Sequence, residues 1–387
     1  MPSPSNQAEL NELVATSGLR HVHLLAWRDL ADDEAGGSEV HASTIAAAWA
    51  HAGLEVTMRT SFAPGKPETE SRDGYRVVRR GGRFSVFPRG VLDELRGNHG
   101  RRDGLVEIWN GVPWLTPLWA TGPRVLWMHH IHGAMWKMAL PPGAAQLGDL
   151  LEHRLAPPFY RRTRIATLSQ SSRDEMVHKL GWKREQIAVI PPGIDARFQP
   201  GETKSPYPLV VAVGRLMPAK HFDDLIRIVA RLRESIPDLE LIIVGEGSER
   251  PRLEAEIRSN GASSYVRLPG RLGDADLIVL YQRAWLLLAT SQSEGWGMTI
   301  TEAAACGTPA VVTDIGGHRD AVQPGITGEL APLHALGEVI GRVLLDTDYR
   351  RRLAAGARAR AQELTWQATA TATFRELALD AARRSQR

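Results

Sequence analysis

The chain has 387 residues, of which 43% are hydrophobic and 24% are charged, and its formal net charge is +3. This length and composition predict a globular enzyme with two cores, and no apolar run is long enough for a membrane-spanning helix. The only cysteine, Cys306, excludes an internal disulfide and a cysteine-based zinc site, and the polar N-terminus argues against export, so we expect a cytoplasmic protein.

Short apolar runs alternate with helical segments through the first half of the chain. The predicted strands there are residues 21–27, 54–60, 105–110, 124–129 and 164–168. A Gly-rich turn at 35–37 leads into a helix, for which Ser38 is the expected N-cap and Gly53 marks the end. Continuous apolar strands separated by helices predict a parallel sheet covered on both faces.

An Arg-rich stretch lies inside this first half. Between Arg72 and Arg102 there are nine arginines and three acidic residues. One interpretation is a solvated surface. The other is a patch that touches an anionic membrane, which would place the protein at the inner face of that membrane, or an acidic acceptor. Nucleic acid is less favoured, because aromatic residues do not interleave the arginines.

The strand–helix pattern restarts after a segment rich in Pro and Gly at 191–208. The predicted strands are 207–214, 239–247, 264–270, 284–290 and 308–314, and the predicted helices between and after them are 221–235, 248–260, 274–283, 298–306, 317–323, 333–362 and 366–380. We therefore predict two doubly wound Rossmann-like parallel-sheet domains, residues 1–195 and 196–365. The segment 366–387 is expected to be a helix that packs back toward the N-terminal domain. Ligands of such sheets bind at the carboxyl ends of strands, so the glycine turns should face a cleft.

Two glutamates stand in the stretch SEGWGMTITEAAACGTPAVVTD, with seven residues between Glu294 and Glu302. Glu294 lies in a glycine loop after a strand, and Glu302 lies one turn into the following helix. The loop amides and the helix N-terminus favour an anion, while the two carboxylates can accept hydrogen bonds from hydroxyl groups. This layout suits a nucleotide-sugar, although the spacing alone is equally compatible with a helix N-terminal acid and a surface loop residue.

Two further strand ends carry candidate site residues. In VGRLMPAKHFDDLI, Gly214 makes a turn and the cations of Arg215 and Lys220 lie five residues apart, which would clamp a diphosphate and stabilise it as a leaving group. In WMHHIHG, three histidines crowd the strand end at 129–132. A metal site is disfavoured because no carboxylate or cysteine stands nearby. One or two of the three would be satisfied structural histidines, and the preferred role for one of them, at a cleft edge, is contact with a sugar hydroxyl.

The chain resembles a family 4 retaining glycosyltransferase of the GT-B fold. SEGWGMTITEAAACGTPAV resembles the family's Glu–seven residues–Glu signature, and VAVGRLMPAKHFDDLI resembles its diphosphate loop. VIPPGID resembles the hinge motif, LIIVGEGSER a strand and turn of the C-terminal domain, and AGGSEVH the glycine loop of the N-terminal domain. Pro192 departs from the asparagine usual in the hinge, which puts the detail of the hinge in doubt.

The resemblance implies a role for each matching residue. Glu302 would bind the ribose hydroxyls, Glu294 would hold donor-sugar hydroxyls near the reacting carbon, and Arg215 and Lys220 would bind the diphosphate. His129 would contact the donor sugar, with His130 and His132 as the other candidates for a sugar or acceptor contact. The remaining donor-binding residues would be Gly36, Gly37, Gly214, Gly295, Trp296, Gly297, Met298, Thr299, Arg271 and Leu272.

The resemblance also implies that no divalent metal or other cofactor is required. Two Asp-x-Asp strings, at 274–276 and 346–348, lie in helical contexts, and capping accounts for the first. We therefore predict a retaining hexosyltransferase that moves a sugar from a UDP- or GDP-sugar to a hydroxyl acceptor such as a glycan, a lipid-linked glycan or a small aglycone.

Three other functional classes compete with this one. A sugar-nucleotide epimerase of the same architecture is the main alternative, and it would need no acceptor. A nicotinamide oxidoreductase would need Gly-x-Gly-x-x-Gly after the first strand, which RDLADDEAGGSE lacks. A sugar-binding protein without catalysis would usually carry an export signal.

Overall fold

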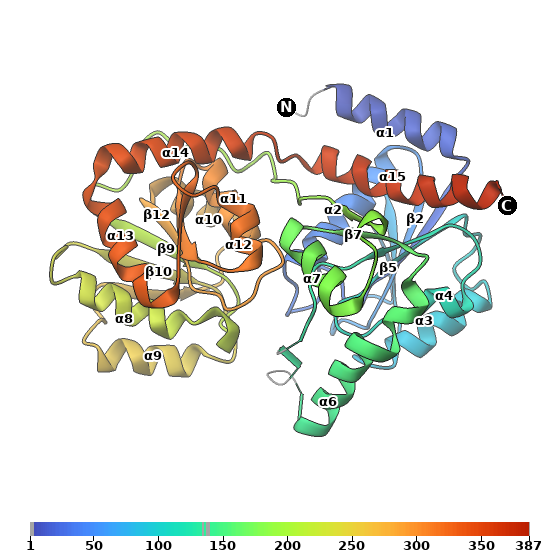
Figure 1. Ribbon diagram of the computed structural model, residues 1–387, viewed down its shortest axis with the longest axis horizontal. Coiled ribbons are helices and arrows are strands. Elements are labelled where there is room, and N and C mark those ends of the chain that lie inside the picture. The colour runs from blue at the N-terminus through green and yellow to red at the C-terminus, as the bar shows by residue number, and fades with distance from the viewer. Residues whose placement is uncertain (1–3, 134, 137–139, 387) are drawn as a thin grey trace. The chain divides into compact units, whose positions relative to one another are not determined.

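The computed structural model describes residues 4–133, 135–136 and 140–386. The chain divides into two compact units (Figure 1). The N-terminal unit comprises Met1–Gly193 together with Thr365–Arg387, and the C-terminal unit comprises Ile194–Leu364. Within the described residues, no helix is both long enough and apolar enough to cross a membrane.

The N-terminal unit is built on an eight-stranded sheet with the order β3-β4-β2-β1-β5-β6-β7-β8. Its strands are β1 (His21–Leu25), β2 (Glu55–Thr60), β3 (Thr69–Arg72), β4 (Tyr75–Arg79), β5 (Gly104–Ile108), β6 (Arg124–Trp127), β7 (Arg164–Thr167) and β8 (Ile187–Val189). All pairs are parallel except β3 with β4. The fully buried side chains of β5 and the near-continuous apolar run of β6 are what a sheet covered on both faces requires.

Helices cover the sheet of the N-terminal unit. They are α1 (Pro4–Ser17), α2 (Gly37–His51), α3 (Val86–Leu95), α4 (Thr116–Trp119), α6 (Pro142–Leu150), α7 (Gln170–Leu180) and the last helix of the chain, α15 (Trp366–Ser385). The rings of Trp49, Trp127 and Phe374 pack edge to face in the core, and the Trp49 indole donates to the Ala370 carbonyl at 2.9 Å. The last helix of the chain therefore completes the core of the unit that begins it, and it lies beside α1 in Figure 1.

The C-terminal unit holds a six-stranded parallel sheet with the order β11-β10-β9-β12-β13-β14. Its strands are β9 (Leu209–Val213), β10 (Glu240–Val244), β11 (Val266–Gly270), β12 (Leu286–Ala289), β13 (Ala310–Thr313) and β14 (Gly328–Ala331). Its helices are α8 (Phe222–Leu232), α9 (Arg250–Ser259), α10 (Asp274–Arg283), α11 (Met298–Ala305), α12 (Gly316–Ala321), α13 (Leu336–Leu345) and α14 (Thr347–Ala361). In α8 the buried Phe222, Leu225, Ile226 and Val229 recur at the spacing of one helix face, which packs on the sheet.

Two details of the predicted elements need correction. Ser38 does not cap α2: Gly36 is the N-cap, and the Glu39 carboxylate accepts from the Gly36 amide at 2.8 Å. Asp274 is the first residue of α10 rather than its cap, which is Gly273, and the Asp274 carboxylate instead accepts from Arg197. In both cases a glycine in extended conformation precedes the helix.

Four strands were not predicted: β3, β4, β8 and β14. The strand β3 has a polar sequence and alternately exposed side chains, because it is the antiparallel edge strand of its sheet.

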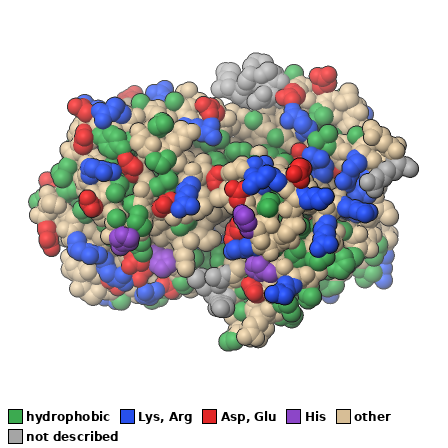
Figure 2. Space-filling model, in the orientation of Figure 1, with side chains coloured by type: hydrophobic (Ala, Val, Ile, Leu, Met, Phe, Trp, Pro, Cys, Tyr) green, Lys and Arg blue, Asp and Glu red, His purple; other side chains and the backbone are tan. Residues whose placement is uncertain are grey.

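The face of the molecule shown in Figure 2 carries acidic and basic side chains interspersed with apolar ones.

Candidate functional site

Three neighbouring strands of the C-terminal unit, β9, β12 and β13, end at one edge of the sheet and lead into the loops predicted to bind a ligand. Backbone and hydroxyl contacts hold these loops together. The Gln292 amide donates to the Ala219 carbonyl at 2.9 Å, the Thr290 hydroxyl donates to the Lys220 carbonyl at 2.7 Å, and the Thr313 hydroxyl donates to the Ser291 carbonyl at 2.7 Å. The edge is therefore a pre-arranged surface rather than three independent loops.

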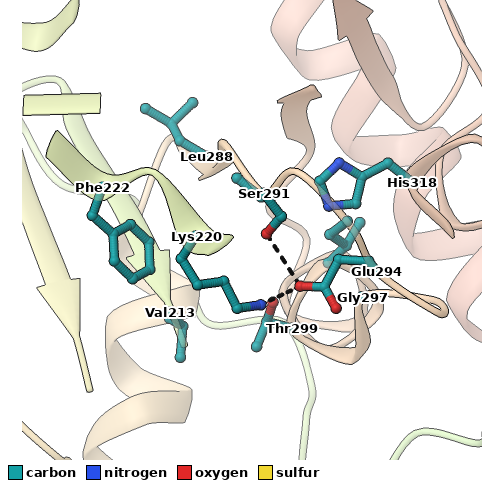
Figure 3. Close-up of a pocket in the computed structure, with 11 residues that line it drawn as sticks. Val213, Lys220, Phe222, Leu288, Ser291, Glu294, Gly297, Thr299 and His318 are labelled. Atoms are coloured by element: carbon teal, nitrogen blue, oxygen red, sulfur yellow. Dashed lines mark hydrogen bonds and ion pairs between the residues drawn. The ribbon is translucent and has the colours of Figure 1, made fainter. Parts of the chain in front are cut away.

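Lys220 and Glu294 meet at this edge (Figure 3). The Lys220 ammonium forms an ion pair with the Glu294 carboxylate, which also accepts from the Ser291 hydroxyl at 3.1 Å. Although burial opposes ionisation, the positive charge of Lys220 and its hydrogen bond help hold the pKa of Glu294 below its ordinary value. The tied loops therefore bring this carboxylate and the Lys220 ammonium into contact.

The helix α11 begins directly behind this ion pair. Its N-cap is Gly297, whose φ of 96° is a left-handed conformation that glycine adopts without strain. A side chain there would also place a Cβ 2.8 Å from Ile300. Gly297 and Thr299 line the pocket beside Lys220, whereas Trp296 is buried at 4% exposure. The glycine turn thus starts α11 at the wall of the pocket, where a helix N-terminus favours an anion.

Glu302 follows one turn into α11, and its environment differs from that of Glu294. The Tyr281 hydroxyl donates to the Glu302 carboxylate at 3.3 Å. Burial raises the pKa of Glu302 to about 7. A carboxyl group that lies at the balance point between its two protonation states can be ionised by ligand hydroxyls that donate to it.

His318 lines the same pocket and was not singled out in the sequence. It lies in α12, and its Nδ1 is 2.8 Å from the Thr313 carbonyl, so Nδ1 carries the hydrogen and Nε2 is left as an acceptor. Burial lowers the pKa of His318, which favours the neutral ring. The signal that could have found it is its position just after the strand end at Asp314, next to the glycine pair 316–317.

The other predicted residues of the C-terminal unit are placed as follows. Arg215 is exposed. A Cβ at Gly214 would lie 3.3 Å from the Lys220 side chain, so the glycine leaves room for Lys220. Arg271 and Leu272 follow β11, the edge strand of the sheet, with Arg271 exposed. The structure therefore gathers Lys220, Glu294, Gly297 and Thr299 in one pocket, and leaves Arg271 and Leu272 outside its lining.

The predicted residues of the N-terminal unit form a separate group. His129 is 5% exposed, and its Nε2 lies 3.3 Å from Nδ1 of His41, a buried residue of α2 that the sequence analysis missed. Burial lowers the pKa of His41 to about 3 and also lowers that of His129, so both rings are neutral at neutral pH. Gly36 and Gly37 lie at the start of the same helix, four residues or more before His41.

His130 and His132 lie on the loop that follows, where their rings stack with centroids 5.0 Å apart. A fully buried carboxylate, Glu152, organises this loop by accepting from the His132 and Gly133 amides at 2.9 and 3.0 Å and from the Trp136 indole at 3.0 Å. Glu152 lies in a π-helical turn, Leu151–Leu155, which directs its side chain inward.

One cluster among the described residues has the side chains of a cation site: His221, Asp223 and Asp224. Arg227 pairs with both carboxylates, at 2.7 and 2.6 Å, and Arg252 pairs with Asp223 at 2.8 Å. The two guanidinium groups already supply the positive charge that a metal would bring, so this cluster is an ion-pair network on α8 and α9.

Two family models match the chain and together span most of it. Residues 194–360 match the model described as glycosyl transferases group 1, and residues 35–198 match glycosyltransferase family 4. The junction of the two matches falls at the division between the structural units. The first match contains the pocket of Lys220 and Glu294, and the second contains the His41–His129 pair.

Curated relatives and solved structures agree with these matches. The chain is 27% identical to a D-inositol 3-phosphate glycosyltransferase of Frankia alni, over 88% of this chain and 94% of that protein. It is 35% identical to a glycogen synthase of Mycobacterium tuberculosis, over 54% of this chain and 52% of that protein. The fold is similar to that of a sucrose-phosphate synthase from Thermosynechococcus elongatus, with a TM-score of 0.79 and 22% identity, covering 92% of this chain and 98% of that one. It is also similar to Anabaena HepE in complex with UDP and glucose, with a TM-score of 0.70 and 20% identity, covering 92% and 98%.

Proposed function

The chain belongs to glycosyltransferase family 4 and has the GT-B fold, and from this premise we propose that it transfers a hexose from a UDP- or GDP-sugar to a hydroxyl acceptor. It is a retaining glycosyltransferase that uses a nucleotide-sugar donor. The observation that carries the finer proposal is the contact of Lys220 with Glu294 at the start of α11, the helix that also holds Glu302. Lys220, Glu294 and the start of α11 line the pocket, and in this proposal Glu302 joins them to bind a ligand with a diphosphate in its middle and hydroxyls at both ends.

The proposed reaction uses the leaving group as the base. The acceptor oxygen attacks the anomeric carbon on the face from which the nucleoside diphosphate departs, and the bond from that carbon to the diphosphate oxygen breaks. The acceptor proton passes to the leaving diphosphate oxygen, so no protein base is needed. The protein supplies charge: Arg215, Lys220 and the first amides of α11 stabilise the negative charge that grows on the diphosphate.

The ion pair gives Lys220 and Glu294 exchangeable partners. The diphosphate would draw the Lys220 ammonium away from Glu294, and the donor-sugar hydroxyls would donate to the carboxylate in its place. The charge of the Lys220 ammonium and that of the Glu294 carboxylate would each have a partner before and after the ligand binds, which limits the cost of desolvating them. Glu302 would accept from the two ribose hydroxyls, and His318 Nε2 could accept from a further hydroxyl in the same pocket.

The N-terminal unit would supply the sugar-contacting histidine and the acceptor site. His129 remains the proposed donor-sugar contact, held in orientation by His41, with His130 and His132 beside it. The Arg-rich stretch 72–102 is proposed to meet an anionic surface, such as a membrane or an acidic acceptor. A relative named for inositol 3-phosphate has an acceptor that carries both hydroxyl and phosphate groups, and this chain could use an acceptor of that kind.

The decisive experiment measures both products of the transfer. Nucleotide-sugars that raise the thermal midpoint of the protein are incubated with candidate hydroxyl acceptors, and nucleoside diphosphate release is followed together with the anomeric proton signal of the product. We expect release that rises with the correct acceptor and an α-linkage from an α-linked donor. An inverted linkage would contradict retention, and a change at another sugar carbon without diphosphate release would contradict transfer.

A further inference from the structure

A second pocket, of about 640 Å³, lies in the N-terminal unit. None of the residues of the histidine cluster, His41, His129, His130 and His132, lines it. Its walls are the segment that follows β2, the Gly81–Gly82 turn after β4, and one face of α3. The turn needs glycine at its first position, because Gly81 has a φ of 84° and a Cβ there would lie 2.9 Å from the Val86 amide nitrogen. The turn therefore closes tightly against the start of α3 and leaves the pocket open beside it.

The pocket carries an excess of positive charge. The helix α3 presents Arg89, Leu92, Asp93 and Arg96 to it, at the spacing that places side chains on one helix face. Arg89 and Arg96 are both exposed, and neither forms an ion pair with the part of the chain that the structure describes. Both guanidinium groups are therefore available to a ligand.

The two acidic residues of the pocket are already neutralised. Asp93 accepts from Arg59 at 3.3 Å and from the Asn98 side chain at 2.9 Å. Although burial opposes ionisation, the Asn98 hydrogen bond and the charge of Arg59 help hold the pKa of Asp93 below its ordinary value. Glu68 pairs with Arg80 at 2.5 Å. Arg79 also lines the pocket and pairs with Asp29. The apolar side chains of the wall are Phe62 and Leu92, exposed at 54% and 43%. A ligand that fits would bring negative charge to Arg89 and Arg96 and an apolar or ring surface to Phe62.

The pocket lies at the same edge of the N-terminal sheet as His129, the proposed donor-sugar contact. It lies beyond the carboxyl ends of β2 and β4, at the sheet edge where His129 also follows β6. Three strand spacings separate β2 from β6 and four separate β4 from β6, which is about 14 to 19 Å. An acceptor that spans this distance could place a charged group in the pocket and a hydroxyl near His129.

We propose that this pocket binds a phosphate group of the sugar acceptor through the guanidinium groups of Arg89 and Arg96. The inference rests on the proposed function only in making the ligand the acceptor. Arginine suits the task because its planar fork donates two hydrogen bonds to phosphate oxygens. The phosphate can come from a soluble phosphorylated acceptor or from a lipid headgroup, and the experiment separates these sources.

The experiment compares two double variants of the full chain. Arg89→Ala/Arg96→Ala empties the pocket of its available cations, and Arg258→Ala/Arg351→Ala removes the same charge from exposed positions of the C-terminal unit. Inorganic phosphate is titrated by calorimetry, and sedimentation is measured with phosphatidylcholine vesicles with and without about one third phosphatidylglycerol. We expect the pocket variant to weaken binding about tenfold or more in one of the two arms, with the control close to wild type. Arg89→Lys/Arg96→Lys, which keeps the charge but loses the fork, should fall between them.

Each outcome either supports or contradicts phosphate binding by Arg89 and Arg96. Loss of phosphate binding assigns a soluble acceptor, and loss confined to anionic vesicles assigns a lipid-borne one. Equal behaviour of the pocket variant and the control in both arms would overturn the proposal. Both arms are independent of donor turnover, so they can succeed even if nucleotide-sugar transfer fails. Conversely, thermal protection by a nucleotide-sugar should be unchanged in the pocket variant.

Discussion

At the residue scale, Glu302 is a carboxyl group whose buried position disfavours its charge. Its pKa rises from 4.5 to about 7, so the folded protein holds this proton over a pH range in which the unfolded chain has lost it. The stabilisation this gives is complete below about pH 4.5 and is lost as the pH rises through 7. A ligand that donates hydrogen bonds to the carboxylate would reverse this preference.

Glu302→Gln should therefore remove a pH dependence from stability. The amide keeps the shape of the protonated acid and does not ionise, so the variant should exceed the wild type in free energy of unfolding at pH 8 by on the order of 1–3 kcal/mol. Near pH 4.5 the two should converge. Urea unfolding at both pH values measures the difference, and parallel pH profiles would show that folding does not raise the pKa of Glu302.

A matched substitution tests the same residue as a ligand. Glu302→Ala should weaken the binding of a nucleoside diphosphate by about 1–3 kcal/mol, because the ribose hydroxyls lose their acceptor. Calorimetry at pH 8 provides the number. Unchanged affinity would remove Glu302 from the proposed site while leaving its effect on stability intact.

Lys220 should contribute more to turnover than to binding. Lys220→Ala removes the ammonium that would stabilise the growing diphosphate charge, so kcat should fall more than KM rises. It also removes a positive charge that lowers the pKa of Glu294, so the activity that remains should decline at a higher pH than in the wild type as acid is added. Lys179→Ala, an exposed lysine of α7, is the control. An effect confined to KM would assign Lys220 to ground-state binding.

At the scale of elements, the loops that follow β9, β12 and β13 depend on close backbone packing. A Cβ at Gly317 in α12 would lie 2.3 Å from the Glu294 carbonyl oxygen, so any side chain there must displace the Glu294 loop. Gly317→Ala should lower nucleotide-sugar affinity, measured by calorimetry, by about tenfold, since a shift of about 1 Å at a positioned group has effects of this order or larger. Gly273→Ala is the control, because a Cβ there meets nothing within 4 Å and Gly273 has a φ of −68°. Equal affinity of both variants would mean that the Glu294 loop tolerates the shift.

The helix α15 offers a second test at this scale. Phe374 is fully buried against Trp49, so Phe374→Ala should lower the free energy of unfolding by about 3–5 kcal/mol. Leu379, on the same helix, is 44% exposed, and Leu379→Ala should change stability by less than about 0.5 kcal/mol. Denaturant unfolding separates the two. A small effect of Phe374→Ala would mean that the core closes without this helix.

Sequence reasoning predicted the strands that are continuous apolar runs. A strand buried on both faces of a sheet is apolar along its whole length, so it can be recognised from its own sequence without knowing which strands it pairs with. Sequence reasoning missed the short edge strands β3, β8 and β14, and it missed β4, which pairs with the edge strand β3. It identified Lys220 and Glu294 separately from their motifs. Their direct contact, across 74 residues of sequence, depends on how two loops pack, and no local pattern records it. The same holds for His41, which meets His129 only after folding.

At the scale of the whole molecule, our proposal has the protein itself, rather than a metal ion, supply the positive charge that stabilises the leaving diphosphate. The prediction is that transfer persists in excess EDTA, because Lys220, Arg215 and the start of α11 meet the diphosphate. The His221–Asp223–Asp224 cluster is neutralised by Arg227 and Arg252, so chelation should not disturb it either. Activity assays with EDTA, followed by added magnesium or manganese, provide the test. Loss with EDTA and recovery with metal would contradict the prediction.

The passage of the chain through both units has a consequence for the order of biosynthesis. Residues 194–364 are contiguous, so the ribosome delivers the whole C-terminal unit before α15 exists. The N-terminal unit, although made first, lacks Ala370, Phe374 and Leu377 of its core until α15 has emerged. The part of the protein translated second can thus be completed first, and the unit with the histidine cluster waits, with apolar surface uncovered, for the last segment of α15. A released chain that ends at residue 365 should therefore hold a protease-resistant C-terminal unit and a protease-sensitive N-terminal one.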